Sequence, residues 1–172
     1  FTGLSFLIRN AAKATSRGVE VELVARPTES LTIDANYGYL QAEYDEFAGN
    51  PSVVGLQFAG LPKSTGSVGL QYAAPVSGTL RLYGRLDTIY YGSSYTKPNA
   101  TTTLNFGGST TFNARLGLES SNGRWGAYLW SKNFGDKRIV GSGSVFPFPR
   151  AVITTGSGAL GRTWGLELRK SF

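Results

Sequence analysis

Arg162-Thr163-Trp164-Gly165-Leu166-Glu167-Leu168-Arg169-Lys170-Ser171-Phe172 is the stretch that decides the fold. Every second residue from Trp164 to Leu168 is apolar, the residues between them are polar or small, and Phe172 is in phase with the apolar set. Because a strand turns alternate side chains to opposite faces, this pattern predicts a β-strand with one apolar and one polar face. Lys170 alone is out of phase, and its long side chain can reach a polar interface.

Composition excludes several classes of function. The 172 residues are enough for one domain with a sizeable core. The chain has no Cys and no His, which removes disulfides, thiolate nucleophiles, the usual general base and the commonest metal ligand. We therefore expect no enzyme, no cofactor and no catalytic or metal-binding residue. The net charge is +6, but Lys and Arg are spread among acidic residues, so we do not expect nucleic-acid binding.

The alternation recurs along the chain and predicts about eight strands. We place them at about residues 4–8, 18–26, 31–43, 68–72, 80–88, 112–118, 125–130 and 162–172. Residues 10–16 are small and polar, so we predict a loop there. The two faces of the strand Trp125–Trp130 are both partly apolar, and alternation leaves its inner face unassigned. No apolar run approaches the ~18 residues of a membrane helix, but the alternating strands of a membrane barrel also average to neutral hydropathy.

Short turns and long loops alternate between these strands. The short turns are Pro27–Ser30, Pro75–Gly78 and Ser121–Gly123, and the long loops are Asp45–Gly60, Gly92–Gly108 and Phe134–Gly161. Counting strands back from Phe172 places every short turn at the same end as the carboxyl terminus. Outer-membrane barrels show this asymmetry, with short periplasmic turns and long external loops, whereas a soluble sandwich has no reason to keep it. The sequence therefore predicts an all-β, antiparallel, up-and-down transmembrane barrel.

Four stretches carry a resemblance to a known family. They are Asn10–Ala14 with Arg17–Leu23, Pro27–Thr32 with Tyr37–Tyr44, Trp130–Arg138, and Arg162–Phe172. In this order and spacing they resemble the carboxyl-terminal barrel region of TonB-dependent outer-membrane receptors, over nearly the whole chain. In the third stretch, Phe134 stands where the family usually has Leu, and Ile139 follows where Tyr is usual.

The resemblance implies a location in the bacterial outer membrane and a part in TonB-energised uptake of a scarce nutrient such as a ferric siderophore. Receptors of this family enclose an amino-terminal plug in a barrel of about 22 strands. We therefore expect residues 1–172 to be the last third or so of a larger barrel, without the plug, supplying barrel wall and external loops. The expected partners are outer-membrane lipid, the plug and remaining strands, TonB through the missing amino-terminal part, and the outer-membrane assembly machinery. The alternative is a self-contained small barrel with a structural or adhesion role.

Within a barrel, alternation assigns each strand residue to the lumen or to the lipid. The predicted lumen-facing polar wall consists of Glu20, Glu22, Asp34, Arg81, Arg85, Asp87, Arg115, Glu119, Glu167 and Arg169. Its mixed charges suit a wall that holds a polar plug, although for any single residue a solvated charge network is the simpler interpretation. The predicted membrane-interface aromatics are Tyr37, Tyr39, Tyr72, Tyr90 and Trp164. The resemblance further implies that the terminal strand carries the signal read by the assembly machinery, through Trp164, Leu166, Leu168 and Phe172.

One motif points elsewhere. Residues Gly156–Gly161 match the G-x-G-x-x-G pattern of dinucleotide-binding proteins. That pattern must open a helix, and an alternating strand follows here instead, so a glycine-rich external loop is the better interpretation.

Overall fold

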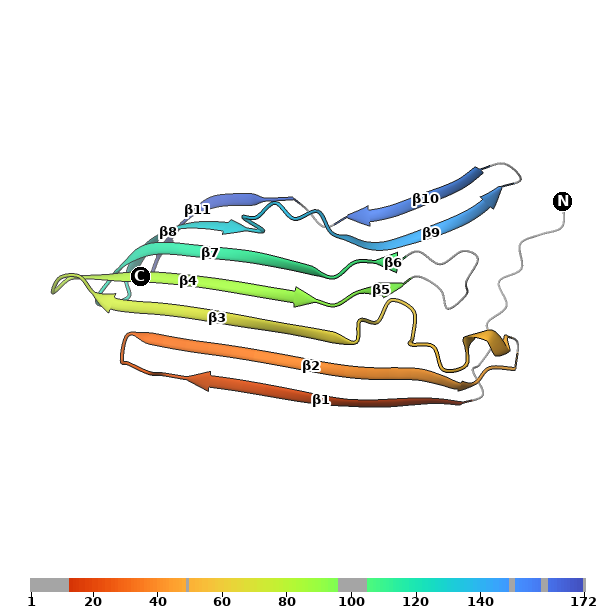
Figure 1. The fold of residues 1–172 in the computed structure, drawn as a ribbon. Helices are drawn as coiled ribbons and strands as arrows, with labels where there is room; N and C mark the ends of the chain where they lie inside the picture. The colour runs from red at the N-terminus through yellow and green to blue at the C-terminus, as the bar shows by residue number, and fades with distance from the viewer. Residues whose placement is uncertain (1–12, 49, 96–104, 149–150, 159–160, 172) are drawn as a thin grey trace.

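The computed structural model describes residues 13–48, 50–95, 105–148, 151–158 and 161–171. An open antiparallel sheet of seven strands makes up most of this part of the chain (Figure 1). The strand order is β1-β2-β3-β4-β7-β8-β11. The bounds are β1 (Lys13–Ala25), β2 (Leu31–Glu46), β3 (Ser64–Pro75), β4 (Leu80–Tyr91), β7 (Ser109–Ser120), β8 (Trp125–Lys132) and β11 (Thr163–Lys170). Neighbours pair antiparallel in chain order, which confirms the predicted up-and-down topology. The expected first strand, at residues 4–8, lies outside the described residues.

The two ends of the sheet carry different connections. The turns β1–β2, β3–β4 and β7–β8 lie at one end, with the carboxyl terminus, on the left in Figure 1. The other end, called here the loop end, carries the long connections. These contain the 3-10 helix η1 (Pro51–Val53), the pair β5 (Ser94–Tyr95) and β6 (Asn105–Phe106), and the hairpin β9 (Val140–Phe148) with β10 (Ala151–Gly158). The predicted asymmetry is confirmed.

Loop predictions are wrong in part where the structure has strands, as in the β5–β6 pair within the predicted loop Gly92–Gly108. Lys13 to Ser16 belong to β1 and pair with residues 42–46 of β2. Small polar residues pair there because ladder hydrogen bonds need backbone groups, not apolar side chains. The predicted connection Phe134–Gly161 contains the β9–β10 hairpin. Gly156 and Gly158 of the dinucleotide-like motif lie in strand β10, and β11 follows with no helix among the described residues between them.

The sheet has one apolar face, and side chains on that face are unusually exposed. Val19 is 62% exposed, Leu116 59% and Leu166 69%. A soluble monomer rarely leaves so large an apolar surface uncovered. Among the described residues no helix is long and apolar enough to cross a membrane.

The register also shows that the strands are staggered. Ala25, the last residue of β1, pairs with Ile33, and the same row continues through Leu70 and Leu86 to Ala114, Ser131 and Trp164. From this row to the turn end, β1 continues for no residue, β2 for two, β3 for five, and β4, β7, β8 and β11 for six each, so the turn ends are staggered from β1 to β4 and level from β4 to β11.

Candidate functional site

The polar face, opposite the exposed apolar face, holds the candidate site. Strand pairing places all ten residues of the predicted polar wall on this one face, from β1, β2, β4, β7 and β11. The structure joins seven of them in two clusters. Glu20, Glu22 and Arg81 have no ion-pair partner within the described part of the chain.

The first cluster, called here the Arg85 cluster, consists of Asp34, Arg85 and Asp87. Arg85 Nη1 lies 3.0 Å from Asp34 Oδ1, and Arg85 Nη2 lies 2.7 Å from Asp87 Oδ1. Gly69 pairs with both Asp34 and Asp87, and a Cβ there would come within 2.4 Å of Asp34 Oδ2 and 2.5 Å of Arg85 Nη2. A side chain at this position would therefore displace the ion pair. All three charged side chains are about one-third exposed, so the cluster is solvated rather than buried.

The second cluster, called here the Tyr128 cluster, joins β7, β8 and β11. Arg115 Nη2 donates to Glu167 Oε1 at 2.9 Å, and the Arg115 guanidinium carbon lies 3.9 Å from the centre of the Tyr128 ring. The guanidinium of Arg169 lies 5.7 Å from the same ring and 3.7 Å from Glu119 Oε1. The Tyr128 hydroxyl donates to Glu119. One aromatic ring therefore contacts two cations, an arrangement stabilised by the negative face of the ring.

Glycines allow Tyr128 to lie against the sheet. A Cβ at Gly117 would come within 2.4 Å of Tyr128 Cδ1, and a Cβ at Gly126 within 2.5 Å of the Tyr128 hydroxyl. Tyr128 is only 2% exposed. In the same way, a Cβ at Gly165 would come within 2.6 Å of the Trp130 ring. Tyr128 and Trp130 thus lie on the polar face, which assigns the strand whose inner face the sequence left open. Aromatic rings placed over glycines cover backbone that a missing side chain would expose.

Two shallow hollows lie along the polar face. One of about 500 Å³ is lined by Asp34, Arg85, Asp87 and Asn113 among others. The other, of about 440 Å³, is lined by Arg85, Arg115, Trp130, Lys132 and Glu167 among others. Their donors and acceptors suit contact with a polar polypeptide or solute. The described residues contain no group of three His, Cys, Asp or Glu side chains that could hold a metal ion.

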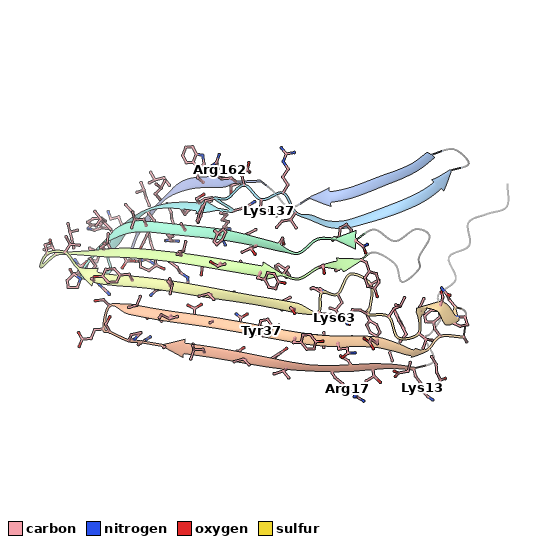
Figure 2. The ribbon with its side chains drawn as sticks, in the orientation of Figure 1. Lys13, Arg17, Tyr37, Lys63, Lys137 and Arg162 are labelled. Atoms are coloured by element: carbon pink, nitrogen blue, oxygen red, sulfur yellow. The ribbon has the colours of Figure 1, made fainter. Side chains whose placement is uncertain are left out.

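The turn after β8 is built from residues in an unusual backbone conformation. Asn133 has φ 50° and Asp136 has φ 52°, in the left-handed region that Asn and Asp tolerate better than most residues. Asn133 N donates to Asn113 Oδ1 at 2.9 Å, and its side chain bonds the backbone N–H and C=O of Lys137. Asp136 Oδ1 accepts from Arg162 N at 2.9 Å, and Figure 2 shows Lys137 and Arg162 where β8 and β11 meet the β9–β10 hairpin. The sequence analysis did not predict that Asn133 and Asp136 build this turn. The Asn and Asp on either side of Gly135 are residue types that favour turns and could have indicated it.

The five predicted interface aromatics all lie on the apolar face, from 40% exposed for Tyr39 and Tyr90 to 74% for Trp164. Tyr37 and Tyr90 pair with Gly66 from either side, towards the loop end, whereas Tyr72 pairs with Gly84, nearer the turns. Leu168 is 74% exposed on the same face. Phe172 lies outside the described residues. Contact of these residues with lipid or with assembly machinery stays a prediction.

Comparison with known proteins places the chain among receptors. A family model described as "TonB dependent receptor-like, beta-barrel" matches residues 1–134. An uncharacterized TonB-dependent receptor from Haemophilus influenzae is 40% identical over 60 residues, which are 35% of this chain and 17% of that protein.

Two solved structures share the fold. The ferric yersiniabactin uptake receptor FyuA from Yersinia pestis superposes with a TM-score of 0.75 at 22% identity, covering 95% of this chain and 24% of the receptor. The siderophore receptor PiuA from Acinetobacter baumannii superposes with a TM-score of 0.69 at 19% identity, covering 90% of this chain and 21% of that receptor. The chain thus spans about a quarter or less of the length of each of these relatives.

Proposed function

Because the chain belongs to the family of TonB-dependent receptor-like β-barrels, we propose that it supplies barrel wall and external loops to an outer-membrane receptor for TonB-energised uptake of a scarce nutrient. Barrels of this family are outer-membrane proteins, and we propose the same location for this chain. The observation that supports the proposal most strongly is the two-faced sheet. Its apolar face is exposed at Val19, Leu116 and Leu166, while its opposite face carries the Arg85 and Tyr128 clusters.

The polar face suits a wall that contacts a plug. Its two clusters alternate in sign, with Arg85 between two carboxylates and Tyr128 beside both cations and Glu119. A lumen filled by a polar polypeptide needs donors and acceptors of both kinds along its wall, because buried polar groups must be paired. We propose that the plug and the remaining strands belong to the same receptor and that TonB acts through the plug.

A ferric siderophore is the substrate class we propose. The support comes from the names of FyuA, a ferric yersiniabactin uptake receptor, and PiuA, a siderophore receptor. Both receptors are less than a quarter identical in sequence to this chain. The likeness therefore shows the fold alone, and the substrate stays a proposal.

The self-contained small barrel is the less supported alternative. Among the described strands, β1 and β11 are opposite edges of an open sheet and do not pair with each other. Exposed sheet edges are not stable in hydrocarbon, so these edges need further strands. A receptor with a larger barrel supplies them directly.

Uptake in cells tests the proposal. The complete receptor containing this chain is expressed in an iron-starved strain that lacks its own siderophore receptors, and the uptake of a panel of radiolabelled ferric siderophores is measured. We expect the cells to take up at least one siderophore, and we expect this uptake to be lost in a matched strain without TonB. Uptake that does not depend on TonB, or none for any iron complex offered, contradicts the proposal. Expression of residues 1–172 alone is the control and should support no uptake.

A further inference from the structure

The hollow of about 440 Å³ on the polar face is lined by residues of β4, β7, β8 and β11. Its charged side chains are three cations and two carboxylates: Arg85, Arg115, Lys132, Asp87 and Glu167. Both carboxylates are already paired, Asp87 with Arg85 at 2.7 Å and Glu167 with Arg115 at 2.9 Å. Lys132 has no carboxylate partner in the part of the chain that the structure describes. One positive charge of this wall is therefore left without a counter-charge.

Asn113 contributes an unused hydrogen-bond donor to the same hollow. Its Oδ1 accepts from the backbone N–H of Asn133 at 2.9 Å. Because a backbone N–H can only donate, this bond fixes which way the Asn113 amide points and leaves its Nδ2 as a donor. Nδ2 has no acceptor among the described residues. An ammonium and an amide NH₂ group of this wall thus both need an acceptor.

The strand register concentrates positive charge around the hollow. Arg85 on β4 pairs directly with Arg115 on β7, and like charges in this arrangement are destabilising. Each guanidinium binds a carboxylate on the strand beyond its other neighbour, on β2 or on β11. Lys132 Nζ lies 5.9 Å from the centre of the Trp130 ring, and Trp130 pairs with Arg115. Cations therefore line the hollow from three neighbouring strands, β4, β7 and β8.

We propose that this hollow receives an Asp or Glu side chain of the plug. The inference rests on the proposed function, which sets the polar face against the plug, and it names the plug group that meets this part of the wall. A plug that fills the lumen removes water from the wall, and a charge or donor that loses water without gaining a partner is destabilising. A carboxylate supplies the negative charge that Lys132 lacks and an acceptor for Asn113 Nδ2. An apolar or basic plug residue in this position would leave both groups unpaired.

Carbodiimide cross-linking of the complete receptor in detergent tests the contact, because this reagent joins an amine directly to a carboxylate that touches it. Peptides joined through Lys132 are identified and quantified by mass spectrometry. We expect an amide bond between Lys132 Nζ and one Asp or Glu of the plug. Lys132→Arg is the matched control, because it keeps the positive charge but removes the reactive amine, so this cross-link should disappear.

Asn113→Asp tests the charge of the hollow without removing the bond to the turn. It keeps the oxygen that accepts from Asn133 N and replaces only the free NH₂ group by a second oxygen. The new carboxylate repels the plug carboxylate and competes for Lys132, so the yield of the cross-link should fall about fivefold. Asn36→Asp adds the same charge to the polar face on β2, outside the hollow, and should leave the yield unchanged.

Three results overturn the inference: a Lys132 that cross-links only to Asp87 or Glu167 of its own wall, a Lys132 that joins no carboxylate, or an equal fall in yield for Asn36→Asp. The unaltered receptor decides the first two, so they do not depend on the folding of any variant. A receptor that shows TonB-dependent uptake but one of these results contradicts this inference alone. Loss of TonB-dependent uptake contradicts the proposed function instead, so the two failures are distinguishable.

Discussion

Asp136 accepts a hydrogen bond from the backbone N–H of Arg162 at 2.9 Å, joining the turn after β8 to the start of β11 across the whole β9–β10 excursion. Asp136 adopts φ 52° in that turn, and Asn133 adopts φ 50° three residues earlier. The bond therefore anchors the last strand at the residue where its pairing with β8 begins, next to the pair Thr163 and Lys132.

Replacing Asp136 by Ala should lower the free energy of unfolding by about 1–3 kcal/mol, because it removes the acceptor and leaves a residue that tolerates the left-handed region poorly. Asp136→Asn keeps an acceptor oxygen and the conformational tolerance, so it should cost far less. Urea unfolding of the complete receptor refolded in detergent measures both. Equal losses for the two variants would show that the negative charge, not the turn, is what matters.

Gly69→Ala should destabilise the Arg85 cluster. The added Cβ would stand within 2.4 Å of Asp34 Oδ2, so the carboxylate or Arg85 must move, which should cost up to about 1 kcal/mol, the contribution of a part-exposed ion pair. Gly78→Ala is the control, because no heavy atom lies within 4 Å of its Cβ position. The same urea titration compares them. A neutral Gly69→Ala would mean that the ion pair rearranges without loss.

An arginine on the apolar face should be much more harmful than one on the polar face. Leu86 lies near the middle of β4 on the apolar face, and Leu86→Arg should cost about 2–4 kcal/mol if that face meets lipid. Thr32→Arg adds the same side chain to the polar face. Thr32 precedes Ile33, which lies in one cross-strand row with Leu86. The folded fraction after insertion into lipid vesicles is the measurement. A larger loss for Thr32→Arg would reverse the assignment of the two faces.

Tyr128 offers a graded test of the Tyr128 cluster. Tyr128→Phe removes only the hydrogen bond to Glu119, a bond to a charged group, and should cost about 1.5–3 kcal/mol. Tyr128→Ala also uncovers Gly117 and Gly126, so the total loss should reach about 3–5 kcal/mol. Both variants are compared by urea unfolding. A Phe variant as unstable as the Ala variant would assign the whole effect to the hydroxyl and none to the ring over the glycines.

Deletion of Phe172 should show whether this residue acts in recognition by the assembly machinery or in the stability of the folded receptor. Phe172 continues the phase of Leu166 and Leu168, which are 69% and 74% exposed on the apolar face. One partly exposed aromatic contributes only about 1–2 kcal/mol by burial, so refolding of the receptor in detergent should change little. Membrane-inserted receptor in cells should instead fall strongly if the assembly machinery reads this residue. Equal loss in both assays would assign Phe172 to stability, and no loss in either would remove it from the assembly signal.

Alternation along the chain was sufficient to predict the sheet and the faces of every described strand in it except β8. A strand has a side-chain period of two, so each residue from Leu80 to Tyr91 is assigned to a face without knowledge of its neighbours. Turns marked by Pro, Ser or Gly, such as the predicted turn Pro75–Gly78, likewise act locally, which is why the turn end was predicted correctly. Small polar strand residues carry no such signal, and Lys13 to Ser16 were misassigned for that reason.

Pairing between strands that are distant in the sequence decided which charged side chains meet and which face of β8 is the polar one. Arg115 and Glu167 are 52 residues apart, and only the register of β7, β8 and β11 brings them to 2.9 Å. The inner side of β8 is likewise set by its neighbours, because Tyr128 needs Gly117 on the adjacent strand to lie flat against the sheet. Outside β8, the sequence by itself determined which face each strand side chain joins, a property of one strand. Only the tertiary structure decided which charges meet, because register is a property of two strands together.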